Sequence, residues 1–481
     1  MIFSYWQQEE MKYEMTLNTV KIFVVFLIIY LTLFAISLNN GFFWDTTHLA
    51  SLQAWWYYDN SFKHFFLPTI IDSGHPSFFA MLLAVMWKVF GVKLIVGHLM
   101  MLPFALLLIW EVLTTCRYYF GSTYSLVAAL LLLNPIILGQ LTLVSPDVVL
   151  FCFFFFTLNG ILGNSKWKIL LGSLVLGAVS LRGMMCVGYL YLFSFLRQDI
   201  TIKSFFQNAF FFSPGILVGI GFLTFHFVQL GWMGYHAESP WAASFESAGV
   251  KGFFRNIVVF IFRMVDMGLI FVWLFMGAAM VFNRKKRFIF SHHTKDLVLL
   301  WILCFLVSVL LQFFYRYSLL HRYLLPLIAI SIMIFCSIAI GNLNLRQFKR
   351  VWIFSLVGLL SGNLWVYPDR IAKGWDATLA HLPYYELRKN ALHYIKSKNI
   401  PLGEVYGGFP YDLTGKCIDL NRDTAMFSKS SADITPYVLY SNISNDFSDE
   451  QLQTLKEKWI IVKQFGDWPV RFVLYRNPVI Q

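Results

Sequence analysis

Apolar runs of about the length of a membrane span recur along this chain, and they constrain its fold more than any other feature. They lie between about residues 20 and 365, and soluble domains do not contain such a series. Only 13% of the 481 residues are charged, against roughly 25% in soluble proteins. The first run, 22–38, has no small-residue cleavage site, so we expect a retained helix rather than a signal peptide. The sequence therefore predicts a polytopic α-helical membrane protein.

The runs predict roughly eleven transmembrane helices when the N-terminus is placed on the inner side. With this count the basic loops "NSKWK", "NRKKR" and "NLNLRQFKR" face inside, as the positive-inside bias requires. The net charge of +12 is therefore a topology signal, and no nucleic-acid partner is implied. The expected spans are 22–38, 96–115, 124–138, 148–162, 169–181, 184–196, 210–230, 257–282, 297–313, 323–340 and 351–365.

The segments outside these spans predict two outer loops and a small outer domain. Segment 76–90 opens with a proline and is shorter than the roughly 20 residues of a span, so we expect an interfacial or re-entrant helix. It belongs to the first outer loop, 39–95, and the second is 231–255. After 367 the composition turns polar, with helix-like "YYELRKNALHYIKSKN" and strand-like "TPYVLYSNI", "KWIIVKQF" and "RFVLYRN". The sequence therefore predicts a transmembrane module over 1–367 and an α/β extracytoplasmic domain over 368–481.

Two acids lie at the same outer boundary in this topology. Asp45 follows the first span in "GFFWD", and Asp147 precedes the fourth in "LVSPD". A carboxylate there can take a proton from an attacking hydroxyl, or bind a divalent cation through its oxygen atoms. His75 is the best further ligand if a metal binds with Asp45 and Asp147. The alternative is that Asp147 only caps a helix and Asp45 is a solvated loop acid.

Three arginines at the outer boundary run against the positive-inside trend. Arg182 lies in "SLRGMM", Arg316 in "YRY" and Arg322 in "HRYLLP". Guanidinium groups bind phosphate oxygens bidentately, so this set suits a lipid phosphate. The alternative is that the side chains snorkel to lipid headgroups.

Three further polar residues at the same boundary complete the predicted substrate site. They are Asp72 and His75 in the first outer loop and Tyr323 beside Arg322. For His75 the alternative is an ordinary hydrogen-bonding residue at the surface.

The order of these motifs resembles that of the GT-C membrane glycosyltransferases. "DSGHPSFF", "SPDVVLFCFFFFTL", "SLRG" and "HRYLLPLIAI" are similar to the protein O-mannosyltransferase and aminoarabinose transferase branch, a glycosyltransferase 39-like family, over about 21–367. The resemblance implies transfer of a sugar from a polyprenyl-phosphate carrier to an acceptor at the outer face, with inversion at the anomeric carbon. It also implies that Asp45 and Asp147 are the two family acids, and that Arg182 and Arg322 are its conserved basic residues.

The chain departs from that family at two places. Thr46 follows Asp45 where many relatives have a second acid, and "GHPS" stands where aminoarabinose transferases have "EKPP". These departures separate the chain from aminoarabinose specificity and from the metal site of that branch.

Taken together, the residues predict a polyprenyl-phosphate-sugar-dependent glycosyltransferase of the cell envelope. Its expected partners are membrane lipids, the lipid-linked sugar and a glycan, lipid or protein acceptor. A divalent metal is a further expected cofactor. We expect it in a bacterial inner membrane, with the N-terminus inside and the C-terminal domain outside. The alternatives are a transporter or flippase of lipid-linked sugars, which would bind charge near the bilayer midplane, and a scaffold protein without catalysis.

Overall fold

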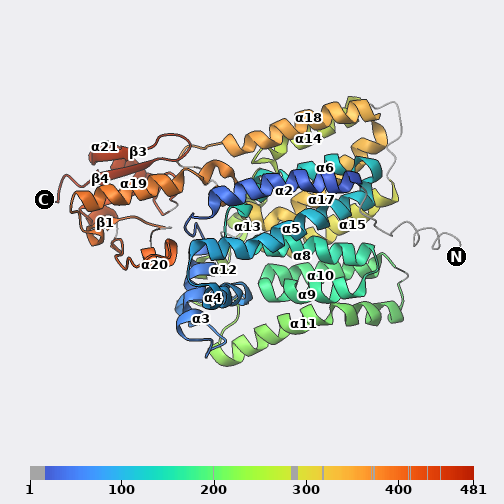
Figure 1. Cartoon of the computed structure of the whole chain (residues 1–481), viewed down its shortest axis with the longest axis horizontal. Helices are drawn as coiled ribbons and strands as arrows, with labels where there is room; N and C mark the ends of the chain where they lie inside the picture. Colours follow the sequence, from blue (N-terminus) through green and yellow to red (C-terminus); the bar gives the residue numbers. More distant parts are fainter. Residues whose placement is uncertain are drawn as a thin grey trace.

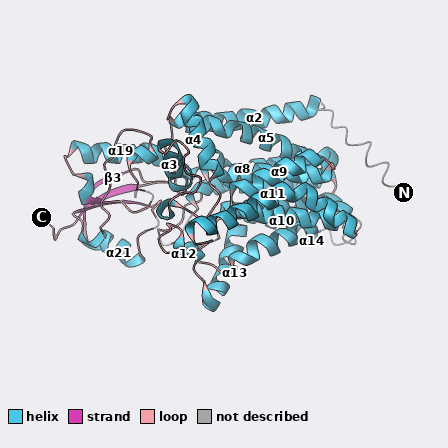
Figure 2. Ribbon diagram, turned by 90° about the horizontal axis from the view of Figure 1, so that it is seen from below, coloured by secondary structure: helices cyan, strands magenta, loops and turns pink. Residues whose placement is uncertain are grey.

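The protein is a bundle of long helices that carries a small α/β domain at one end. The computed structural model describes residues 17–480 apart from 199, 283–290, 317–318, 370, 372–373, 410, 412, 431 and 445. Figures 1 and 2 show the α/β domain at one extreme of the molecule, and the first described helix begins toward the other. We call the extreme with the domain the sheet end.

Consecutive helices of the bundle run in alternating directions. α2 (Leu17–Ser37) runs toward the sheet end and α5 (Leu94–Phe120) runs back. Thr19 and Tyr30 of α2 hydrogen-bond to Tyr124 and to the Leu132 carbonyl of α6, each at 3.1 Å, so α6 is parallel to α2. The other elements are α6 (Tyr124–Leu132), α7 (Pro135–Leu141), α8 (Pro146–Leu162), α9 (Lys166–Val179), α10 (Leu181–Leu196), α11 (Ile202–Leu230), α12 (Ala242–Phe245), α13 (Gly249–Val265), α14 (Leu269–Phe282), α15 (His292–Cys304), α16 (Leu310–Gln312), α17 (Leu325–Asn342) and α18 (Leu345–Ser361).

Every predicted span coincides with helix, which confirms a bundle of apolar helices. Five helical stretches of the described chain are long and apolar enough to cross a membrane alone, and the bent pair α13–α14 makes a sixth. The apolar helices α4 (Phe78–Phe90), α8 and α10 are shorter. The count of eleven crossings stays a prediction.

Two of the expected spans are broken rather than continuous. In 124–138 the break is at Asn134, whose side chain accepts from the Ile136 N–H while Pro135 starts α7. In 257–282, α13 and α14 meet at 77°. Gly268 there has φ +79, and a Cβ would lie 2.5 Å from the Leu359 carbonyl oxygen, so only glycine fits. Residues 257–282 are apolar on both sides of this break, so hydropathy alone predicted one continuous span.

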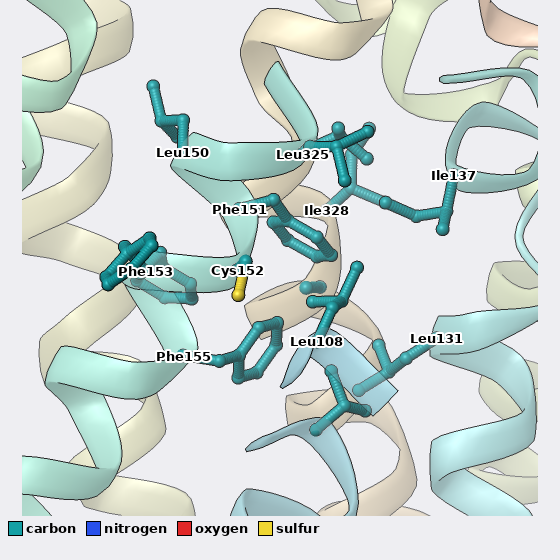
Figure 3. Close-up of a cluster of buried hydrophobic side chains, with 14 of the residues drawn as sticks. Leu108, Leu131, Ile137, Leu150, Phe151, Cys152, Phe153, Phe155, Leu325 and Ile328 are labelled. Carbon is teal, nitrogen blue, oxygen red and sulfur yellow. The ribbon is translucent and has the colours of Figure 1, made fainter. Parts of the chain in front are cut away.

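The centre of the bundle is α8, which is buried on all sides between α5, α9, α10 and α17. A helix that is apolar around its whole circumference is stable only in such a position. Figure 3 shows Phe151 and Phe155 on the side that faces Leu108 and Ile328, with Phe153 on the opposite side. The row of phenylalanines is therefore core packing.

The short helix α4 lies along the first outer loop at the sheet end and does not run to the other end. Its Trp87 ring packs against Trp55 and Tyr58, near the two ends of α3 (Gln53–Asp59). At its other end Ser77 hydrogen-bonds to the Tyr57 hydroxyl. Both ends of α4 are thus held by one short helix, in agreement with the predicted interfacial segment.

The basic clusters that set the predicted topology lie at the end opposite the sheet where they are described. Lys166 and Lys168 begin α9, and the "LRQFKR" segment begins α18. Residues 284–287 of the third cluster lie outside the described residues. The charge asymmetry between the two ends therefore agrees with the positive-inside interpretation.

The C-terminal domain is a four-stranded mixed sheet covered by one helix on each face. The strand order is β1 (Val405–Tyr406), β2 (Tyr437–Ser441), β4 (Phe472–Arg476) and β3 (Ile460–Phe465), with α19 (Tyr384–Ser397) and α21 (Asp449–Lys458) as the helices. Only the β1–β2 pair is parallel. Leu439 and Leu474 pack with the α19 side chains, while Val438 and Val473 pack with those of α21. Strand alternation thus supplies two cores, as an α/β domain requires.

Candidate active site

Arg322 lies at the centre of a cluster of three carboxylates at the sheet end of the bundle. Its guanidinium forms ion pairs with Asp45, with Asp147 (Nε to Oδ2 3.0 Å) and with Asp376. The arginine side chain is only 4% exposed, and Asp45 is the most exposed of the three acids at 20%. A buried guanidinium needs such partners because an unpaired buried charge is costly.

Each of the two predicted acids is set by a local turn at a helix end. Trp44, with φ +55, reverses the chain after α2, and the Thr46 hydroxyl closes the turn by donating to the Phe43 carbonyl. Asp147 is in the first turn of α8, where Ser145 caps the helix by accepting from the Asp147 N–H at 3.2 Å. The sequence placed both acids at one boundary, and the structure brings them to the same guanidinium.

Arg182 joins the cluster from the first turn of α10. Its Nη1 lies 2.6 Å from Asp147 Oδ1, so Asp147 lies between two arginines. Its guanidinium also stacks 3.7 Å from the centre of the Tyr323 ring. Arg182, Arg322 and Tyr323 are therefore brought together as the sequence predicts.

His75 belongs to the same region, but as a neutral group. Burial, together with the positive charge of Arg182, lowers the pKa of His75 to about 4, although the Asp147 charge acts in the opposite direction. Its Nδ1 is buried and has no hydrogen-bond partner among the described residues. A neutral imidazole beside Arg182 can accept or donate a hydrogen bond to a ligand.

Asp72 is separated from this cluster and connects the two outer loops. Its Oδ2 lies 3.0 Å from His226 Nε2, and His226 Nδ1 lies 2.9 Å from the Trp232 carbonyl oxygen. Both ring nitrogens face acceptors, so the geometry calls for a doubly protonated imidazolium. Ser239 also donates to the Asp72 carbonyl at 2.7 Å. Asp72 thus has a structural role, and its contact with substrate stays a prediction.

Arg316 is likewise outside the cluster. It forms an ion pair with Glu246 of the second outer loop at 2.6 Å, and its side chain is 50% exposed. The backbone of the two segments is also joined, because the Arg316 N–H donates to the Glu246 carbonyl at 2.9 Å. Its predicted role in substrate binding stays a prediction.

Sequence reasoning missed Asp376 because the boundary at 367/368 assigned it to a separate domain. Asp376 is buried in the short helix η7 (Trp375–Ala377), which packs on α7 of the bundle. The available signal was an acid between apolar residues in "GWDATLAHL" within a polar tail. The C-terminal segment after 367 and the bundle therefore share the site.

A second buried cluster, around Asp266, was also missed. Asp266 lies at the break between α13 and α14, accepts from His321 Nε2 at 2.8 Å and from the Met267 N–H at 2.7 Å, and binds the Tyr367 hydroxyl. His321 directly precedes Arg322, so this cluster fixes the backbone of the site arginine. An acid inside the apolar run 257–282 was the signal, because such a group calls for a partner.

The residues at the site do not fit the expected divalent metal. The carboxylates of Asp45 and Asp147 face the guanidiniums of Arg322 and Arg182. Among the described residues, no group of three or more His, Cys, Asp or Glu side chains is arranged to hold a metal ion. We therefore derive no step through a metal, and its presence stays an expectation of the sequence.

A narrow apolar pocket adjoins the charged cluster on the bundle side. Arg182 and Tyr323 contribute to its wall, so it begins beside the guanidinium that stacks on the tyrosine. Its other walls come from α8, α10, the α15–α16 region and α17. Its apolar lining includes Leu150, Cys186, Tyr189, Cys304, Val309 and Leu327. With a volume of about 20 Å³, the pocket has room for about one water molecule and not for a hydrocarbon chain.

Solved structures share this architecture over nearly the whole chain. The crystal structure of ArnT from Cupriavidus metallidurans bound to undecaprenyl phosphate has a TM-score of 0.54 and 14% identity, covering 94% of this chain and 97% of its own. The chain has the fold of ArnT. The apo crystal structure of ArnT matches over the same shares with a TM-score of 0.51 and 13% identity. No protein-family model and no curated protein sequence matches the chain.

The likeness to ArnT, an aminoarabinose transferase, confirms the GT-C resemblance at the level of the fold. It also agrees with an integral membrane protein in which apolar helices are followed by a small sheet. At 13–14% identity the likeness carries no residue roles.

Proposed function

We propose that the protein is an inverting glycosyltransferase that moves a sugar from a polyprenyl-phosphate carrier to an acceptor hydroxyl. The observation that carries this proposal is the partly exposed Asp45 carboxylate paired with Arg322, which also pairs with the Asp147 partner of Arg182, in a chain with the fold of ArnT. The site lies at the sheet end, which we place at the outer face of a bacterial inner membrane. The acceptor is a glycan, a lipid or a protein.

In the proposed reaction Asp45 accepts the proton of the acceptor hydroxyl. The hydroxyl oxygen forms a bond to the anomeric carbon, while the bond from that carbon to the phosphate oxygen breaks and its electron pair stays on the phosphate. Attack opposite the leaving group inverts the anomeric configuration. The products are the glycosylated acceptor and the free polyprenyl phosphate. Asp45 suits the base role because it is the carboxylate of the cluster that solvent reaches most easily.

Arg182 is the group that we assign to the leaving phosphate. Among the described residues it forms one ion pair, with Asp147, and keeps N–H groups for a phosphate oxygen. The ArnT structure with undecaprenyl phosphate supports a lipid of this class.

The transporter or flippase interpretation is less well supported. A transporter keeps its binding charges near the bilayer midplane between repeats. Here the charged cluster lies at the helix ends nearest the sheet, and a residue of the outer domain completes it. We therefore favour transfer chemistry at one surface.

The experiment compares glycolipids and glycoproteins from cells that express the wild type or Asp45→Asn at equal membrane levels. We expect one product to lose a single sugar mass in the variant, because the amide cannot take the proton; the loss should be at least about 100-fold. Asp59→Asn is the matched control, since Asp59 is an exposed acid of the same loop that pairs with Lys416 at 3.2 Å. Identical profiles for wild type and Asp45→Asn would remove Asp45 as the base.

A further inference from the structure

We propose that Asp376, a residue of the outer domain, is a positioning residue. It fixes the guanidinium of Arg322, which in turn fixes the Asp45 carboxylate for the transfer reaction. This inference rests on the proposed function and adds a task for the outer domain. It follows from three observations: the anchoring of Asp376, the pairing of Arg322 with three carboxylates and the unequal surroundings of the two arginines.

The segment that carries Asp376 is anchored to the same element that leads into Asp147. The Asp376 carbonyl accepts from Gln140 Nε2 at 2.8 Å, and Gln140 Oε1 accepts from Ser145 Oγ at 2.6 Å. Ser145 is the residue that caps α8 at Asp147. A chain of hydrogen bonds therefore sets the two acids relative to each other.

The backbone of this segment also touches α7 without intervening side chains. A Cβ on Gly139 would lie 2.5 Å from the Thr378 nitrogen and 2.9 Å from the Asp376 carbonyl oxygen. The close approach leaves η7 little freedom to shift. Asp376 is thus a fixed point of the site although it belongs to the outer domain.

Each of the three guanidinium nitrogens of Arg322 faces a different carboxylate. Nε faces Asp147, Nη2 faces Asp45 and Nη1 faces Asp376. A guanidinium paired with three carboxylates is held more firmly than one paired with two, because turning it would separate one of the ion pairs. Without Asp376 the guanidinium would turn toward another acceptor, and Asp45 would lose its fixed partner.

The two arginines therefore have different tasks. Arg322 forms ion pairs with three carboxylates of the protein and positions them, whereas Arg182 has one ion pair among the described residues and receives the phosphate. This division predicts that loss of Asp376 lowers turnover without lowering the affinity for the carrier phosphate.

The test uses the full-length protein in nanodiscs, with undecaprenyl phosphate as the probe and native mass spectrometry as the readout. Product formation is measured in cells as for Asp45→Asn. For Asp376→Asn we expect product to fall at least about tenfold, because a displaced base loses much of its effect. Probe binding should stay within about twofold of wild type, since Arg182 is unchanged. Asp376→Glu keeps the charge and should give an intermediate product level.

Two further variants separate this inference from the proposed function. Arg182→Ala should lose probe binding, and Asp369→Asn should change neither readout, because Asp369 pairs with Arg471 at 2.6 Å and Lys456 at 2.8 Å in the same outer domain. Unchanged product in Asp376→Asn would overturn the inference while leaving the proposed function intact. Joint loss of product and probe binding in both Asp376 variants would also overturn it, since the role would then be structural. A wild type that binds no probe would overturn the proposed function itself.

Discussion

Arg322 and His75 lie in the same site, and burial disfavours the charged form of both, but their charged neighbours act in opposite directions. Arg322 keeps its charge because three carboxylates surround it, so its burial is compensated. Two charged groups act on His75, and the effect of Arg182 is larger than that of Asp147. Burial and the positive charge of Arg182 both favour the neutral imidazole. At the scale of single residues, the site is thus built from charges that are fixed by partners and one ring that is kept neutral.

The neutral His75 predicts a defined pH dependence of stability. The unfolded chain protonates this histidine near pH 6.5, whereas the folded protein does so near 4, so its contribution is complete above pH 6.5 and is lost as the pH falls toward 4. The loss is at most about 1.4 kcal/mol per pH unit. The thermal unfolding midpoints of wild type and His75→Gln, recorded from pH 7 to 4.5, measure this loss of stability. The wild type should fall more steeply; parallel curves would contradict the buried neutral state.

At the scale of elements, the break between α13 and α14 organises the backbone around the site. Asp266 at this break holds His321 of the short helix η5 (His321–Leu324) and Tyr367 of the connection to the outer domain. Gly374, two residues before Asp376, also packs on His321, because its Cβ would lie 2.6 Å from the ring nitrogen Nδ1. One carboxylate therefore joins three segments that are distant in sequence.

This junction predicts different effects for two substitutions of His321. His321→Leu removes the ring nitrogen that bonds to Asp266 Oδ2 and should lower the free energy of unfolding by about 3 kcal/mol, with a loss of product. His321→Gln keeps an N–H donor and should retain more than half of the wild-type free energy of unfolding and more than half of the wild-type product level. Thermal unfolding in detergent and product mass spectrometry measure the two variants. Equal losses would show that ring packing, and not the bond to Asp266, carries the effect.

At the scale of the whole molecule, the two ends of the bundle differ in charge and in chemistry. Lys166, Lys168 and the start of α18 lie at one end, while the arginine–carboxylate cluster and the sheet lie at the other. The positive-inside bias then predicts an orientation in which the site faces outward. A site at that surface can receive a carrier from the bilayer and an acceptor from the aqueous side.

The orientation predicts a labelling pattern for two single substitutions. The six native cysteines are buried, which leaves a low background. Lys396→Cys on α19 should react with a membrane-impermeant maleimide in intact spheroplasts, and Lys349→Cys on α18 should react only after permeabilisation; both positions are exposed. The reverse pattern would place the sheet end inside the cell and would contradict transfer at the outer face.

The sequence by itself determined the helical bundle, the α/β domain and the meeting of Asp45, Asp147, Arg182, Arg322 and Tyr323. It could do so because apolar runs fix which end of a helix each residue occupies, and residues at one end of a bundle lie near one another.

Only the tertiary structure decided which side chains touch. Asp45 and Arg322 are 277 positions apart, and Asp72 and Asp266 lie 154 and 55 positions from their partners His226 and His321. The bends at Asn134 and Gly268 and the docking of η7 on Gly139 depend on close backbone approach, which local hydropathy does not encode. Hydrophobicity is additive along a chain, whereas ion pairs depend on distances of a few ångströms between elements, and packing sets those distances.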